Sequence, residues 1–300
     1  MDRVYLQTYL HKYPFPEQAI QSLLKGFDDI KADEYLRNVI DYWINAYENK
    51  QLQTLNELIA AYADVKRAAK KAVMPCQTVE MIYFLLCTKQ LKETYTENSI
   101  ELSYYDAFAL DLISKAQECY DVDGVWGSSV DDWFVPFFAL MRVAIGRLQF
   151  EITYMPNCCS VDGTYVFGGQ RAINIHIPSG SPLDIAKVRQ SMKEAVRFYG
   201  HYFEEDRVLF TCRSWLLYPG HYQMLPSNSR IRQFMDEFTL ITVEIDPVGK
   251  DLWRIFKTRN VQNIDELPVD TNLQRSYAEW LKQGKPIGVA RGICYLPKGI

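Results

Sequence analysis

The sequence lacks the patterns by which a metal site or a disulfide framework is recognised. Its seven cysteines are odd in number and include no Cys-x-x-Cys pair, and its four histidines show no metal-ligand spacing. Adjacent Cys158 and Cys159 are not expected to bond each other, because normal disulfide geometry does not suit neighbouring residues. We therefore expect reduced thiols, as in a cytoplasmic protein, and no bound metal.

The chain also lacks a long apolar run and a strong charge of either sign. Its most apolar stretch, residues 133–145, contains Pro136 and Arg142 and is too short to cross a bilayer, which takes about 20 apolar residues. The first residues show no basic leader, apolar core or cleavage site. The formal net charge is -4, and no block of Lys or Arg stands out. We expect neither a membrane nor a nucleic acid as a main partner.

What the sequence does have is enough hydrophobic side chain for two folded cores. Of its 300 residues, 48% are hydrophobic and 23% are charged, as is usual in folded soluble proteins. The length exceeds that of one typical domain, so we expect two. The run DVDGVWGSS, with Gly124 and Gly127, marks the boundary. The fold class expected is α/β (α+β), with an all-helical domain over 1–125 and a mixed-sheet domain over 126–300.

The first domain is predicted to be an array of helices. Residues 1–120 repeat apolar side chains at the spacing of about 3.6 residues that one helix face requires. Asp28 or Asp29 is expected to cap one of these helices at its start. Further helices are expected over 98–120 and, past the boundary, over 131–145.

The second domain alternates strand and helix patterns. Strands are expected over 148–154, 164–167, 172–177, 207–218, 240–245 and 288–296, and helices over 183–203, 229–238 and 271–283. Asp162-Gly163 and Gly168-Gly169 are tight-turn signals around one short strand. In open α/β sheets, ligands bind where parallel strands end and helices begin. The loop SGSP, between a strand and a long helix, is such a place.

The sequence resembles a known family at this point. The order of β meander, INIHIP, small-residue loop, long helix, FTCRSWLL, helix and strand is similar to the core of the GNAT fold. The combination of NIHIPSGSPLD, QSMKEAVRFYGHYF, CRSWLLYP and LPSNSRIRQF resembles a bacterial family of predicted acyltransferases. Members of that family pair a helical N-acyltransferase N-terminal domain with a GNAT-like C-terminal domain. The resemblance covers nearly the whole chain and is sharpest over residues 171–238.

The resemblance implies direct transfer of an acyl group from acyl-CoA or acetyl-CoA, as co-substrate, to a small-molecule amine. Backbone N–H groups of two splayed parallel strands would polarise the thioester carbonyl. The loop after the first strand, with Ile177, Ser179, Gly180 and Ser181, would bind the cofactor's pyrophosphate. The usual Gln/Arg-x-x-Gly-x-Gly/Ala pattern is missing here. A capping box from Ser181 to Asp184, which would use the same amides, is the alternative.

Four side chains near these strand ends are candidates for the chemistry. His176, on the same strand face as Asn174, could take the amine proton, or could be a hydrogen-bonded structural residue. Cys212 and Ser214 share a face of the next strand and could be nucleophiles or donors. Packing for Cys212 and a local backbone contact for Ser214 are the alternatives. Tyr218 follows that strand, where an acid for the departing thiolate would be needed.

Two other functions stay open. A binding or regulatory module could keep the fold without the donor site, since fold alone does not give function. A hydrolase built on Cys212 is the third hypothesis. Glu151 and Glu244, on predicted strands, could accept an amine proton or face solvent. The transferase hypothesis depends on two parallel strands, ending near Ile177 and Leu217, that part at their tips. The sequence carries no signal for an oligomeric state.

Overall fold

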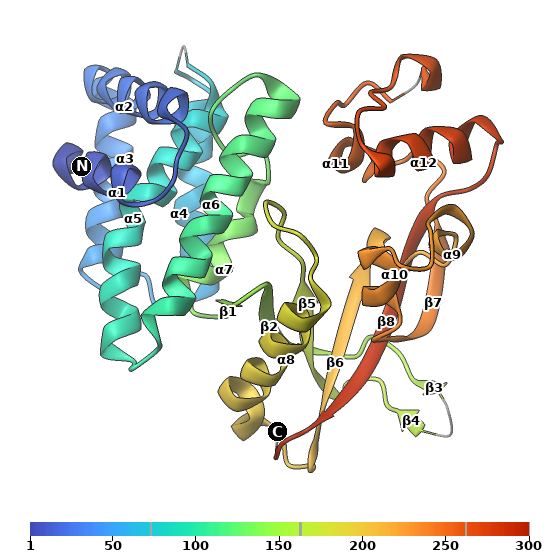
Figure 1. Cartoon of the computed structure of the whole chain (residues 1–300). Helices are drawn as coiled ribbons and strands as arrows, with labels where there is room; N and C mark the ends of the chain where they lie inside the picture. The colour runs from blue at the N-terminus through green and yellow to red at the C-terminus, as the bar shows by residue number, and fades with distance from the viewer. Residues whose placement is uncertain (73, 162–163, 262, 300) are drawn as a thin grey trace. The chain divides into compact units, whose positions relative to one another are not determined.

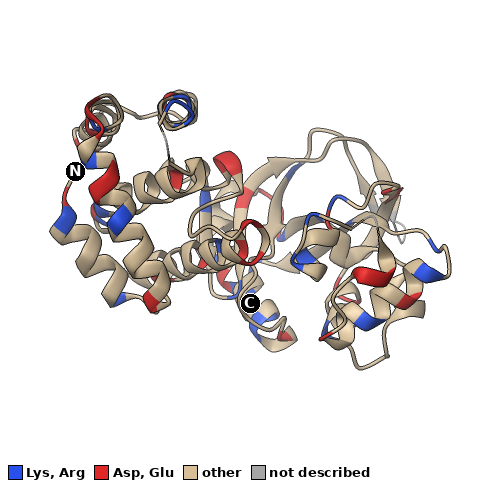
Figure 2. Ribbon diagram, turned by 90° about the horizontal axis from the view of Figure 1, so that it is seen from above, with Lys and Arg blue, Asp and Glu red and all other residues tan. Residues whose placement is uncertain are grey.

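The computed structural model in Figure 1 describes residues 1–72, 74–161, 164–261 and 263–299. It divides into two compact units, Met1–Ala144 and Ile145–Ile300. The turn expected at Asp162-Gly163 lies outside the described residues. Within the described residues, no helix has the length and apolar character needed to cross a membrane. Lys and Arg are interspersed with Asp and Glu along the ribbons of both units (Figure 2).

The first unit is an array of helices. They are α1 (Arg3–Lys12), α2 (Glu17–Ala32), α3 (Glu34–Glu48), α4 (Leu55–Ala69), α5 (Cys76–Glu97) and α6 (Leu102–Asp123). α5 contacts each of the other five, and its turns from Thr78 through Thr88 are buried on every side. A helix that is apolar all round belongs inside a core. The array is therefore built around α5 (Figure 1).

Side-chain caps set several helix starts. Asp33 accepts a hydrogen bond from the Leu36 N–H and begins α3. The cap expected at Asp28 or Asp29 is wrong, because α2 continues through both residues to Ala32. An acidic residue inside a helix and one at its start look alike in sequence until the burial pattern on both sides is known.

The helix expected over 131–145 is also wrong. Its place is taken by η1 (Asp131–Phe134), α7 (Val135–Phe138) and the strand β1 (Arg142–Ile145). The helical conformation ends before Leu140, which has a φ of 52° in the left-handed region. Aromatic side chains of η1 and α7 pack on the helices: Phe134 and Phe138 contact Phe84 of α5. The compact units divide after this segment, and the boundary expected at residue 125 lies before it.

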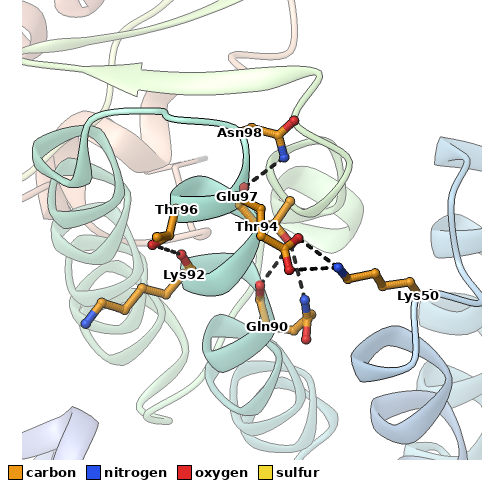
Figure 3. Close-up of polar contacts among 7 residues, drawn as sticks. All are labelled: Lys50, Gln90, Lys92, Thr94, Thr96, Glu97 and Asn98. Atoms are coloured by element: carbon orange, nitrogen blue, oxygen red, sulfur yellow. Dashed lines mark hydrogen bonds and ion pairs between the residues drawn. The ribbon is translucent and has the colours of Figure 1, made fainter.

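The C-terminal end of α5 is closed by polar contacts (Figure 3). Asn98 donates its side-chain amide to the Thr94 carbonyl at 2.8 Å, which satisfies one carbonyl of the last turn. Lys50 reaches both oxygens of Glu97, at 2.7 and 2.8 Å, from the segment that follows α3. This exposed ion pair contributes about 0–1 kcal/mol to stability, so its main effect is to position Lys50 against the end of α5.

The second unit is built on a mixed sheet. Its strands are β2 (Leu148–Tyr154), β5 (Arg171–His176), β6 (Arg207–Ser214), β7 (Thr239–Ile245) and β8 (Gly288–Pro297), in the spatial order β2-β5-β6-β8-β7. β5 and β6 are parallel, and the other neighbours are antiparallel. A separate hairpin joins β3 (Cys159–Val161) to β4 (Thr164–Val166). The helix α8 (Ile185–Tyr199) connects β5 to β6, as a parallel pair requires.

Shorter helices complete the second unit. They are η2 (Gly200–Tyr202), η3 (Trp215–Leu217), α9 (His221–Met224), α10 (Arg230–Met235), α11 (Leu252–Phe256), η4 (Ile264–Glu266) and α12 (Asn272–Lys282). The strand expected over 207–218 is wrong past Ser214, because the Ser214 hydroxyl accepts the Leu216 N–H and starts η3. A continuous apolar run does not by itself separate a strand from a short buried helix.

The two faces of the sheet differ in what covers them. Phe210 pairs with Ile173 and Cys294, so these three share a face. Met192 of α8 lines a pocket together with Cys294, so α8 covers this face, which we call the helix face. On the opposite face, Ala172 packs with β3, β4 and neighbouring residues. We call it the hairpin face.

Candidate active site

The parallel strands β5 and β6 part toward their carboxyl ends. They pair at Ile173 with Phe210 and at Asn174 with Thr211, and no later pair joins them within the described chain. Beyond that point β5 stays bonded to β2, and β6 stays bonded to β8. Because N–H groups alternate sides along a strand, some amides of both ends point between the strands. The pairing of β5 with β6 therefore stops before their carboxyl ends, as the expected parting requires.

Arg147 holds the loop between β5 and α8 through hydrogen bonds. The Arg147 guanidinium donates to the carbonyls of Pro178, Ser181 and Pro182, at 2.8, 3.0 and 3.0 Å. Arg147 is only 8% exposed. Gly180 has a φ of 88°, a conformation open mainly to glycine. One buried cation therefore fixes three carbonyls of one loop.

This arrangement also orients the amides of the loop. In a planar trans peptide, the N–H of one residue points opposite to the carbonyl of the residue before it. The carbonyls of Pro178 and Pro182 point to Arg147, so the N–H groups of Ser179 and Leu183 point away from it. Backbone amides beside a helix start suit an anion.

Asp184 caps α8. Its carboxylate accepts the N–H groups of Ala186 and Lys187 at 2.9 and 3.2 Å. The capping box expected to begin at Ser181 is wrong, because the helix starts three residues later than that reading requires. Two first-turn amides are therefore used by Asp184, while Ser179, Gly180 and Ser181 lie before the helix.

His176 belongs to a polar cluster on the hairpin face. Its Nε2 lies 2.7 Å from a carboxylate oxygen of Glu151, and Asn174 donates to the same oxygen at 3.0 Å. Glu151 and Asn174 are directly opposite each other on β2 and β5. The short contact to a carboxylate favours a proton on Nε2 of His176, and the Asn174 amide nitrogen lies 3.1 Å from the same nitrogen. Both His176 and Glu151 are about four-fifths buried, with side chains 18% and 22% exposed.

Cys212 and Ser214 occupy the end of the neighbouring strand β6. The Cys212 thiol is fully buried on the helix face, and burial raises its pKa to about 12. His176, on the hairpin face, lies on the other side of the sheet. The Ser214 hydroxyl is engaged by the Leu216 N–H at 3.2 Å. Neither side chain is arranged as an activated nucleophile.

Tyr218 follows η3 and is buried, and burial raises its pKa above the ordinary value. The next histidine, His221, is fully buried and contacts the Tyr277 hydroxyl through Nε2 at 2.5 Å. Burial lowers the pKa of His221 to about 4, so this imidazole is neutral at pH 7. Tyr218 can thus keep its proton at neutral pH, whereas His221 has a structural role.

Comparison with known families identifies both halves of the chain. Residues 5–140 match the N-acyltransferase N-terminal domain, and residues 142–294 match the GNAT-like C-terminal domain. The chain belongs to this GNAT-like acyltransferase family. The resemblance and the fold class expected from the sequence are confirmed, with a helical first part and a mixed-sheet second part.

Three solved structures illustrate the likeness, and each covers 97% of this chain and 88% of its own. An acyltransferase in complex with decanoyl-CoA and teicoplanin has 20% identity and a TM-score of 0.71. An acyltransferase in complex with CoA and 10C-teicoplanin has 20% identity and a TM-score of 0.74. A mutant acyltransferase with octanoyl-CoA has 21% identity and a TM-score of 0.73. At this identity the likeness shows the fold. Among curated proteins, none matches the chain.

Arg147, which holds the loop of the candidate site, is the residue that sequence reasoning missed in this GNAT-like chain. It precedes β2 and is more than 30 positions from the loop that it holds. The one available signal was a charged residue next to Gly146, a glycine with positive φ, in the turn before a buried strand. Among the described residues, no group of His, Cys, Asp and Glu side chains is placed to hold a metal ion.

Proposed function

We propose that this chain is an N-acyltransferase that moves an acyl group directly from acyl-CoA to the amine of a small molecule. The observation that carries the proposal is the parting of β5 and β6 beside the loop that Arg147 holds. Family membership supports it. A cytoplasmic location is part of the proposal, since acyl-CoA is made and used inside cells.

The proposed reaction uses the two strand ends together. The N–H groups of Ser179 and Leu183 bind the donor's pyrophosphate, with Ile177, Gly180 and Ser181 completing the loop, and amides between the strands polarise the thioester carbonyl. The amine attacks that carbon and gives its proton to His176, whose Nε2–H is held by Glu151. The new C–N bond forms, the C–S bond breaks, and the thiolate takes a proton from Tyr218.

Calorimetric titration with acyl-CoA tests the proposal. The similar structures hold decanoyl-CoA or octanoyl-CoA, so these donors are tested first, with acetyl-CoA as the short-chain comparison. An amine panel with mass spectrometry then detects the amide product. Replacing His176 with Gln should lower kcat about 100-fold, whereas His201→Gln, which changes an exposed histidine, should leave it unchanged. Equal activity of both variants would remove His176 from the mechanism.

A binding module without catalysis is the second candidate. The observation that favours it is Asp184, whose carboxylate lies on the helix start and uses two of its amides. The parting of the strands favours the enzyme. Absence of binding for every acyl-CoA in the titration would decide for the module.

A further inference from the structure

Two arginines stand in register on the hairpin face, across the parting from His176. Arg213 of β6 and Arg291 of β8 are directly opposite each other, so their side chains share one face. Like charges in this position repel each other. Arg213 is matched by Glu244, which accepts at 3.2 and 2.6 Å. Asp251 also attracts Arg213, but it is paired with Arg254, so the two guanidinium groups and Glu244 leave an excess positive charge.

Arg291 is the guanidinium that carries this excess. Its hydrogen bond goes to the Thr211 hydroxyl at 3.4 Å, which is long and neutral. Within the described residues, Arg291 forms no ion pair. Burial and the neighbouring Arg213 both lower its pKa, with burial the larger cause. Glu244 attracts Arg291 through space, but its hydrogen bonds go to Arg213. Arg291 has therefore lost part of its water without a hydrogen bond to a carboxylate, and its planar set of donors suits one.

The register places these arginines level with the proposed base. Asn174 pairs with Thr211, so two residues further along the parallel strands His176 is level with Arg213 on the same face. Arg291 is on the next strand, opposite Arg213. Neighbouring strands lie about 5 Å apart, so the backbone at Arg291 is at least about 10 Å from that at His176. The long arginine side chains can cover part of that separation.

We propose that Arg291, with Arg213 beside it, binds a carboxylate of the amine acceptor. The inference rests on the proposed N-acyltransferase function and specifies its acceptor class. Negative charge at Glu151 lies on one side of the parting and excess positive charge on the other. An acceptor with an amine at one end and a carboxylate several bonds away matches this distribution. The acceptor class is therefore an amino acid with a separated amine, or a larger molecule that presents one.

The test compares paired acceptors and paired products. The acceptors are 4-aminobutanoate and 4-aminobutanamide, which differ in the carboxylate alone, with octanoyl-CoA as donor. The products, N-octanoyl-4-aminobutanoate and its amide, are titrated calorimetrically, so that the carboxylate preference is measured even where turnover fails. The variants are Arg291→Gln and, as the matched control, Arg207→Gln, which changes an exposed arginine at the opposite end of β6.

The wild type should prefer the carboxylate member by about 10- to 100-fold in kcat/KM and in product affinity, as charge-assisted hydrogen bonds provide. Arg291→Gln should abolish that preference without changing KM for octanoyl-CoA, and Arg207→Gln should retain it. Equal binding of the two products by the wild type, or an unchanged preference in Arg291→Gln, overturns the inference. Product preference without turnover would support the carboxylate site while counting against the transfer reaction itself.

Discussion

Replacing Arg147 with Met should impair use of acyl-CoA while leaving use of a truncated donor intact. Arg147 donates to three carbonyls of the loop that we propose as the pyrophosphate site. Methionine keeps much of the side-chain length and removes every donor. Without those donors the loop loses the contacts that turn the Ser179 and Leu183 amides outward.

The magnitude follows from the hydrogen bonds that are lost. A hydrogen bond to a charged group contributes about 1.5–3 kcal/mol net. Ser181 and Pro182 are exposed, so water can replace part of what their carbonyls lose. We therefore expect a total cost of about 2 kcal/mol for holding the loop in its binding conformation, well below three full contributions. A cost of about 2 kcal/mol makes the binding-competent conformation of the loop less populated, and this lowers the apparent affinity for the donor about 30-fold.

The assay follows thiol release with a chromogenic thiol reagent, with octanoyl-CoA and octanoyl-pantetheine as donors. Octanoyl-pantetheine lacks the pyrophosphate, so Arg147→Met should raise KM for octanoyl-CoA alone. Arg189→Met, which breaks the exposed ion pair with Glu237, is the matched control and should change neither KM. An equal loss with both donors would mean that Arg147 supports the fold in general, and no loss with either would refute the loop argument.

Three further predictions concern groups whose burial shifts a pKa. Burial lowers the pKa of His221 to about 4. As pH falls from about 6.5 to 4, the unfolded state gains a proton that the folded state does not, so about 3 kcal/mol of unfolding free energy should be lost. Urea unfolding measured across pH should show a flatter profile for His221→Gln. Cys212→Ala should keep its kcat, because the thiol is buried and burial raises its pKa to about 12. Urea unfolding should show a loss of about 1 kcal/mol of stability. Loss of activity in a folded Cys212→Ala protein would restore the hydrolase hypothesis. The Glu80 carboxyl group accepts a hydrogen bond from Tyr62 at 2.6 Å, and burial raises the pKa of Glu80. The contribution of Glu80 to stability therefore falls as pH rises through its folded-state pKa. Glu80→Gln should raise Tm at pH 7, and a lower Tm would contradict this reasoning.

Much of the fold could be predicted because its signals are local. Strand β2 alternates apolar and polar side chains, and its expected range, 148–154, is the observed one. The segment 131–145 failed because tertiary packing decided it. The segment was expected to form one helix, yet Phe134 and Phe138 pack against α5 from two short helices, and Leu140 leaves the helical conformation. Helical periodicity alone cannot reveal where such a segment leaves the helix.

In the candidate site, too, local features could be predicted from the sequence and long-range contacts could not. His176 and the loop that follows it could be predicted together, because they adjoin along one strand, loop and helix. The contact between His176 and Glu151 depends on the register of β2 with β5, which sequence pattern alone leaves open. The contacts from Arg147 span more than 30 positions and depend on where a turn meets a loop. Long-range placement of single polar side chains is what the sequence could not supply.

The placement of side chains on opposite faces of the sheet bears on the type of acyl transfer. A route through an acyl-enzyme needs a nucleophile and a base within hydrogen-bond reach. Cys212 is buried on the helix face, and His176 points to the hairpin face. A base on the hairpin face can therefore serve an amine that arrives from that side, but it cannot activate the Cys212 thiol. The geometry thus favours attack by the amine on the thioester in a single transfer, with the amides of β5 and β6 between them.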